Sequence, residues 1–82
     1  MHTPSRREMQ MHGRCESIAF KEAHYTPPPL TLAERRFCAL SVVGWNRTRE
    51  EEDLLALSDL DLSRVYIAEL EEEYLSQDEP YA

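Results

Sequence analysis

The sequence predicts a small all-α protein, a three-helix unit that follows an N-terminal arm. Two Thr-x-x-Glu motifs, Thr31 with Glu34 and Thr48 with Glu51, have the residue types of capping boxes, in which two side chains bond backbone amides at a helix start. Apolar residues then recur three and four positions apart, which is the spacing of one helix face. With only 82 residues, the chain has room for a single small core.

Three consecutive prolines at residues 27–29 divide the chain. Because each proline ring fixes φ and removes a backbone donor, we expect an extended spacer there. Residues 1–26 form the arm, in which Ser5 and Glu8 can cap one helical turn. We expect the arm to order against the rest of the chain or against a partner. The alternative is a frayed tail. Residues 30–76 form the helical domain, and residues 77–82 form a polar tail.

The first helix of this domain is predicted over residues 32–43. Thr31 begins it, and Gly44 is placed to end it in a left-handed cap. We expect Trp45, which follows directly, to fold back over the core. The predicted core face consists of Ala33, Phe37, Leu40 and Val43.

A second, shorter helix is predicted over residues 49–57. Its capping box is Thr48 with Glu51, and its first turn is acidic, as the helix dipole favours. The turn at residues 58–61 has short polar side chains that can cap a third helix over residues 62–76. The predicted buried residues are Leu54, Leu55 and Leu57 in the second helix and Leu62, Val65, Tyr66, Ile67, Leu70 and Tyr74 in the third.

This order of elements resembles a helix-turn-helix. More narrowly, Leu-Thr-Leu-Ala-Glu at residues 30–34, with Phe37 and Gly44, is similar to the opening of LuxR-type and sigma region 4 modules. The resemblance covers residues 30–75 and implies a helix-turn-helix-like fold whose last helix enters the DNA major groove. In that case arginines would contact phosphates, and the candidates are Arg35, Arg36, Arg47, Arg49 and Arg64, with Arg6 and Arg7 in the arm.

The charge distribution disfavours such DNA binding. Residues 1–49 hold eight of the nine Lys and Arg side chains, whereas residues 50–82 hold twelve of the sixteen acids and only Arg64, in a chain of formal net charge -7. Phosphates would repel the acidic third of the chain. The third helix also offers one cation where a recognition helix needs several base-reading side chains.

The acidic third fits a basic surface on a larger protein instead. Complementary potentials speed encounter and select partners, while apolar anchors fix the register. The candidate acidic contacts are Glu50, Glu51, Glu52, Asp53, Glu69, Glu72 and Glu73, and the candidate aromatic anchors are Trp45, Tyr66 and Tyr74. A row of carboxylates can also mimic a phosphate backbone in a partner's nucleic-acid groove.

In size and charge the chain is similar to small acidic inhibitors encoded by phages and mobile elements, including anti-CRISPR proteins and inhibitors of host transcription. The leading hypothesis is therefore a noncatalytic regulator or inhibitor that binds a larger protein. A helix-turn-helix DNA-binding regulator is one alternative, and a structural or homodimeric subunit joined through the Leu and Tyr stripe of residues 62–76 is another. A solvated face that only keeps the domain soluble would use the same carboxylates.

The sequence offers little for catalysis. The metal-ligand types His12, Cys15, His24 and Cys38 lack the paired short spacings of zinc fingers, and the two glycines do not form a phosphate-cradling loop. We therefore expect no enzyme, metal or cofactor. Two cysteines are too few for a disulfide scaffold, and the chain has neither a signal-peptide core nor a membrane-length apolar run, so we expect a cytoplasmic protein.

Overall fold

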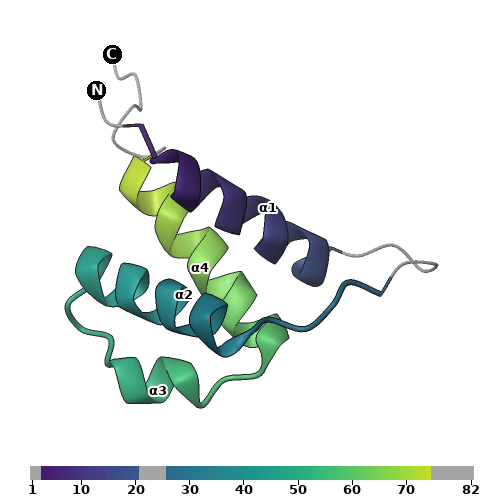
Figure 1. The fold of residues 1–82 in the computed structure, drawn as a ribbon. Coiled ribbons are helices and arrows are strands. Elements are labelled where there is room, and N and C mark those ends of the chain that lie inside the picture. The colour runs from purple at the N-terminus through teal and green to yellow at the C-terminus, as the bar shows by residue number, and fades with distance from the viewer. Residues whose placement is uncertain (1–2, 21–25, 75–82) are drawn as a thin grey trace.

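The computed structural model describes residues 3–20 and 26–74, and over these residues it contains four helices and no strand (Figure 1). The predicted all-α class is confirmed. The helices are α1 (Arg6–Ala19), α2 (Leu32–Trp45), α3 (Glu51–Leu55) and α4 (Asp59–Tyr74). α4 packs against both α1 and α2, and α3 packs against α2.

The N-terminal arm orders against the helical domain as α1, a helix of 14 residues rather than the single turn expected. The predicted cap is present, because the Ser5 side chain accepts from the Glu8 amide and the Glu8 side chain accepts from the Ser5 amide. α1 runs antiparallel to α4 (Figure 1). The Tyr74 hydroxyl, in the last described turn of α4, donates to Oε1 of Glu8 over 2.9 Å.

The proline segment is held in place by side chains from two helices. Arg14 of α1 donates to the carbonyl oxygens of Pro28 and Pro29, over 3.0 and 2.9 Å. The next residue, Leu30, is buried, and its amide donates to Oδ2 of Asp59 at the start of α4 over 3.0 Å. These contacts hold residues 28–30 against α1 and the start of α4.

α2 begins as predicted but ends later than predicted. The capping box of Thr31 with Glu34 is formed in both directions. The expected left-handed cap at Gly44 is wrong: no described glycine has a positive φ, and α2 continues to Trp45 with Asn46 as its cap. A glycine can extend a right-handed helix as well as end it, so its position alone does not fix the end.

The predicted second capping box is not formed. α3 begins at Glu51 without a side-chain cap, and the Thr48 hydroxyl instead donates to Oδ1 of Asn46 over 2.6 Å. The amide of Thr48 also donates to this oxygen, over 3.1 Å, so the threonine closes the preceding turn. α3 therefore spans five residues, where residues 49–57 were predicted.

α4 begins three residues before the predicted start at residue 62. Ser58 caps it, because its Oγ accepts from the Asp61 amide over 3.1 Å, and so the predicted turn at residues 58–61 is mostly the first turn of the helix. The described part of α4 ends at Tyr74. The predicted end at residue 76 and the polar tail at 77–82 lie outside the described residues.

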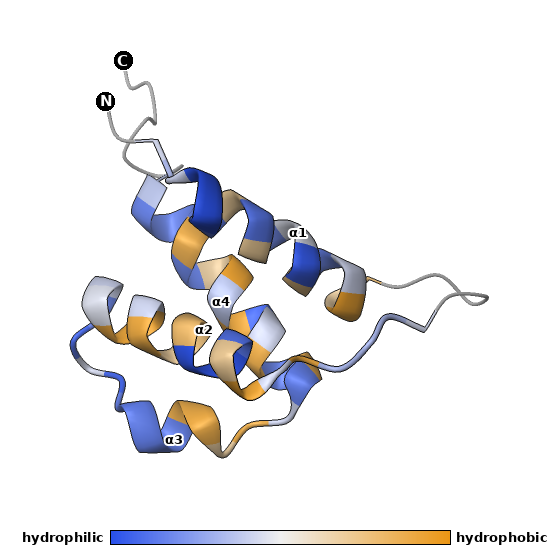
Figure 2. Cartoon of the chain, viewed as in Figure 1, coloured by the Kyte–Doolittle hydropathy of each residue, from blue (hydrophilic) through white to orange (hydrophobic). Residues whose placement is uncertain are grey.

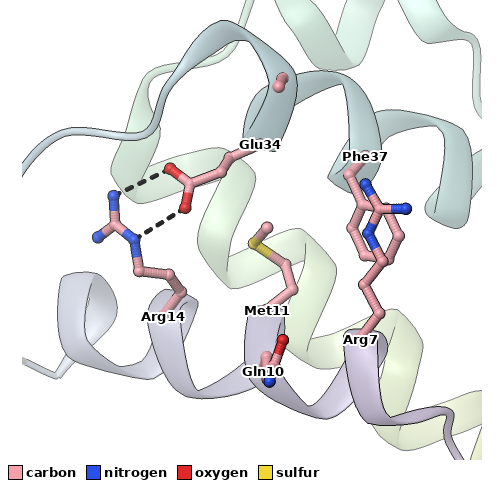
Figure 3. A pocket seen from close by; sticks show the side chains of 7 residues that line it. Arg7, Gln10, Met11, Arg14, Glu34 and Phe37 are labelled. Carbon is pink, nitrogen blue, oxygen red and sulfur yellow. Dashed lines mark hydrogen bonds and ion pairs between the residues drawn. The ribbon is translucent and has the colours of Figure 1, made fainter.

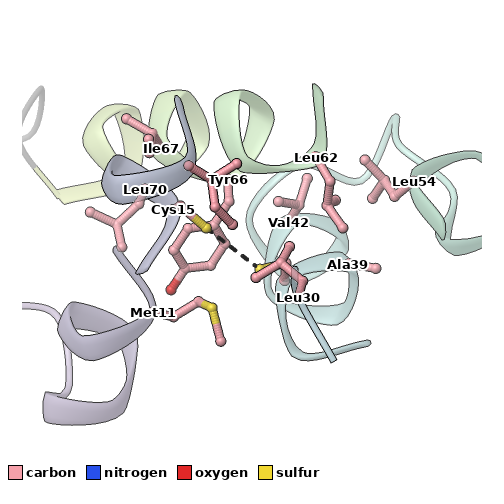
Figure 4. Packing of buried hydrophobic residues seen from close by; sticks show 12 residues of the cluster. Met11, Cys15, Leu30, Ala39, Val42, Leu54, Leu62, Tyr66, Ile67 and Leu70 are labelled. Atoms are coloured by element: carbon pink, nitrogen blue, oxygen red, sulfur yellow. Dashed lines mark hydrogen bonds between the residues drawn. The ribbon is translucent and has the colours of Figure 1, made fainter. Parts of the chain in front are cut away.

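A single hydrophobic core joins all four helices (Figure 4). At its centre the Sγ atoms of Cys15 and Cys38 lie 3.9 Å apart, and both side chains are fully buried. The buried apolar residues are Met11, Cys15, Ile18, Leu30, Cys38, Ala39, Val42, Leu54, Leu62, Tyr66, Ile67 and Leu70.

The predicted core face of α2 is partly wrong. Leu40 is 56% exposed and Ala33 is exposed, while Phe37 and Val43 are half-buried against the core. The buried positions are instead Cys38, Ala39 and Val42. Because almost every residue from 37 to 43 is apolar, the sequence pattern does not single out one face, and hydropathy is high around much of this helix (Figure 2).

Candidate interaction surfaces

The acidic candidates fall into three structural situations. Glu69 is a structural residue: its side chain is only 11% exposed and lies against the turn that follows α2. Its Oε2 accepts from Nδ2 of Asn46 over 3.0 Å and lies 3.5 Å from Nε of Arg49. A partner would have to break these bonds to reach Glu69, so it is a poor contact residue.

The second group consists of the four consecutive acids Glu50, Glu51, Glu52 and Asp53 at the start of α3. All four are exposed, and three of them occupy the first helical turn, where the N-terminal end of the helix dipole stabilises negative charge. These acids therefore have a structural explanation in a short helix that lacks a side-chain cap.

The third group, which we call the α4 acidic patch, consists of the candidates Glu72 and Glu73 together with Glu71, which was not among the candidates. Glu71 and Glu72 are exposed, and Glu73 is half-buried. They lie in the last described turn of α4, which contains no basic residue, and the helix dipole disfavours negative charge at this end. His12 of α1 places Nε2 at 3.7 Å from Glu71, a contact that becomes an ion pair only when the imidazole is protonated.

The acids do not form one continuous row. Figure 1 places α3 and the end of α4 in separate parts of the molecule, with α2 between them. Within the described residues, these candidate acids thus lie in two regions on different helices.

The aromatic candidates differ in accessibility. The expectation of a surface anchor at Tyr66 is wrong, because this side chain is fully buried and its hydroxyl donates to the Glu8 carbonyl over 3.1 Å. Burial raises the pKa of its hydroxyl well above the ordinary value. Trp45 and Tyr74 are half-buried, with ring centroids 6.0 Å apart in an edge-to-face arrangement, and they adjoin the α4 acidic patch through Tyr74. Burial and the hydrogen bond to Glu8 raise the pKa of Tyr74 as well.

The five candidate DNA-contacting arginines of the helical domain do not form a common surface. Arg35 pairs with Asp59 and donates to the carbonyl oxygens of Leu55 and Leu57, so it ties α2 to the α3–α4 turn. Arg49 is paired with Glu69. The exposed arginines Arg36, Arg47 and Arg64 lie on three different segments: α2, the turn after it, and α4.

The outer face of α4 has the wrong charge for a recognition helix. Its exposed side chains carry three carboxylates and one guanidinium. The exposed residues of α4 are Leu60, Asp61, Arg64, Ala68, Glu71 and Glu72. A helix that enters the major groove presents donors and cations to bases and phosphates. This composition argues against reading of DNA by α4.

Sequence reasoning missed an ion pair between α1 and α2. Arg14 donates from Nε and Nη2 to the two carboxylate oxygens of Glu34 over 3.1 and 3.0 Å (Figure 3). The Arg14 guanidinium holds the pKa of Glu34 below its ordinary value, assisted by the Thr31 amide. The two residues are twenty positions apart, so only the packing of the arm on the domain brings them together.

The cysteine pair is a second feature that the sequence did not indicate. The hydrogen bond with Cys15 and burial both raise the pKa of the Cys38 thiol, which opposes formation of the reactive thiolate. Within the described residues, no group of three or more His, Cys, Asp or Glu side chains could hold a metal ion. Both side chains are fully buried and in contact, so Cys15 and Cys38 pack as small apolar residues between α1 and α2.

Comparisons of the chain with protein-family models, with curated proteins and with solved structures find no match. Within residues 3–20 and 26–74, none of the helices combines the length and apolar character needed to cross a membrane.

Proposed function

We propose that the chain is a noncatalytic interaction protein, a regulator or inhibitor that binds a basic surface of a larger protein through the α4 acidic patch. The observation that carries this proposal is the position of Glu71, Glu72 and Glu73 in the last described turn of α4, toward the end of the helix where the dipole disfavours negative charge. Carboxylates needed only for solubility are better tolerated at other exposed positions. The neighbouring half-buried rings of Tyr74 and Trp45 provide the apolar edge that fixes an interface.

The test compares two charge-neutralised variants of the full chain. One carries Glu71→Gln, Glu72→Gln and Glu73→Gln; the control carries Glu51→Gln, Glu52→Gln and Asp53→Asn and removes the same charge from α3. Each immobilised protein is exposed to a nuclease-treated cell lysate and eluted with increasing salt. The expected result is a stoichiometric protein that wild type and the α3 variant retain, that salt releases, and that the α4 variant does not retain.

Two outcomes would contradict this proposal. Equal loss of the retained protein in both variants would mean that net charge, rather than the α4 acidic patch, attracts it. If no protein is retained but duplex DNA binds in the absence of nuclease, and Arg36→Ala with Arg47→Ala weakens that binding, the DNA-binding alternative replaces it.

A further inference from the structure

A groove runs between α1 and α2 on a part of the molecule that the proposed function does not use. It consists of two adjoining depressions with volumes of about 370 and 490 Å³. Arg7, Ala33 and Phe37 line both depressions, so the two are continuous. Met11 of α1 adds to the apolar lining of the first (Figure 3).

The lip of this groove on α2 is an exposed apolar row. Leu32 is 62% exposed and Leu40 is 56% exposed, and both line the second depression together with Phe37. Single exposed leucines are ordinary on protein surfaces. Two of them at i and i+8, beside a continuous apolar groove, form the patterned helix face that usually packs against another element. Over the described residues, both leucines remain exposed, while the Arg7 guanidinium lies over the ring of Phe37.

The rim of the groove is positively charged although the whole chain is negative. The guanidinium of Arg7 lies 4.7 Å from the centroid of the Phe37 ring, and Arg36 is exposed between the two leucines. Among the described residues that line the groove, the one acid is Glu34, and it is already paired with Arg14. The rim therefore keeps an excess of positive charge in a molecule of formal net charge -7.

We propose that this groove binds an amphipathic helix of another protein, one whose aliphatic side chains are flanked by glutamates or aspartates. Aliphatic side chains of the guest bury Leu32, Leu40 and Phe37, and its carboxylates pair with Arg7 and Arg36. A helix fits better than a strand, because α1 and α2 offer side chains rather than open backbone hydrogen-bonding groups. A nucleic acid would leave the two leucines unburied and would be repelled by the remainder of the chain.

The experiment measures binding of a fluorescein-labelled synthetic helical peptide with leucines four residues apart and glutamates beside them. A control peptide carries lysines in place of the glutamates. By fluorescence anisotropy, wild type is expected to bind the glutamate peptide at least about tenfold more tightly than the lysine peptide, since the rim selects the charge.

Protein variants locate the site. Leu40→Ser and Arg36→Glu are expected to weaken binding of the glutamate peptide by at least about fivefold each, because they remove an apolar contact and reverse a rim charge. The matched controls are Leu60→Ser, at an exposed leucine beside a different depression, and Arg64→Glu, on the outer face of α4; both should leave affinity within about twofold. Circular dichroism checks that each variant remains folded.

The proposal is overturned if wild type does not distinguish the two peptides, or if the control variants weaken binding as much as the groove variants. It is also overturned if wild type self-associates in sedimentation and Leu40→Ser makes it monomeric, since a second copy then fills the groove. Neutralising the α4 acidic patch should not weaken peptide binding, so failure of the proposed function would be seen separately.

Discussion

Glu34 is the residue in which local and long-range interactions meet. Its carboxylate caps α2 through the Thr31 amide and also holds Arg14 of α1. The capping role was predicted from the Thr-x-x-Glu spacing, because both partners lie within one helical turn. The ion pair was not predicted, because its geometry depends on how α1 packs on the rest of the molecule.

Because the pKa of Glu34 is lower in the folded chain than in the unfolded chain, its stabilising effect is present above the unfolded pKa, about 4.3, and is lost as pH falls through the folded value. Glu34→Gln is expected to lower the free energy of unfolding by about 1–2 kcal/mol at pH 7. The difference in the free energy of unfolding between wild type and Glu34→Gln should shrink as pH falls below about 4.3. Urea unfolding at several pH values measures this difference.

The control for this experiment is Glu52→Gln, at an exposed acid of α3, which should cost less than about 0.5 kcal/mol. A gap between wild type and Glu34→Gln that does not change with pH would show that the Arg14 pair does not stabilise the fold.

Two serines near the start of α4 have opposite roles. The Oγ of Ser63 is fully buried and has no hydrogen-bond partner among nitrogen and oxygen atoms of the described residues; it adjoins the Cys15 sulfur, which is a weak partner. Ser58, in contrast, caps the helix.

Ser63→Ala is therefore expected to leave stability unchanged or to raise it by up to about 1 kcal/mol, because it removes a buried polar group with poor compensation. Ser58→Ala should cost about 1 kcal/mol through loss of the cap. Chemical denaturation of both variants measures these two changes in stability. A clear destabilisation by Ser63→Ala would mean that the Ser63 hydroxyl has a strong hydrogen-bond partner, which would contradict this interpretation.

At the scale of elements, α2 shows which features of a helix the sequence predicts and which it does not. The start of α2 follows from Thr31, whereas its buried face was misassigned because every residue from Phe37 to Val43 except Ser41 is apolar. The length of α1 was missed although Met11, Cys15 and Ile18 are spaced four and three apart, which is the signal that could have indicated it.

The two Thr-x-x-Glu motifs give a matched test of helix capping. Thr31→Ala should lower the free energy of unfolding by about 1 kcal/mol, because it removes the side-chain acceptor of the Glu34 amide. Thr48→Ala should cost less, about 0.5 kcal/mol, because Thr48 closes a turn with Asn46 and does not cap α3. Urea unfolding of both variants measures the difference, and equal costs would contradict the assigned roles.

At the scale of the whole molecule, every helix contributes to one core. Tyr66 of α4 lies within it, with its hydroxyl bonded to α1 and its ring 5.5 Å from that of Trp45 at the end of α2. The sequence identified Tyr66 as part of an apolar stripe, but it could not separate a core tyrosine from a surface anchor. That distinction depends on α1, which covers this side of α4.

Such a core should unfold in a single transition. The fluorescence of Trp45, the only tryptophan, reports on α2 and α4, while reaction of Cys15 and Cys38 with an aromatic disulfide reagent reports on the contact of α1 with α2. We expect the thiols to be unreactive in the native state and both probes to give the same urea midpoint. Thiol reaction at a lower urea concentration would instead mean that α1 detaches independently.

The packing of α1 on α4 also has a consequence for synthesis of the chain. The ribosome makes α1 first, yet the helix that buries Met11 and Cys15 is the last of the four to emerge. Until α4 has left the exit tunnel, the apolar side of α1 lacks its main packing surface and has only its contacts with α2, so the fold closes only when translation of α4 is complete. A nascent chain arrested before α4 would be open to proteases and chaperones, and completion of this one helix would end that exposure.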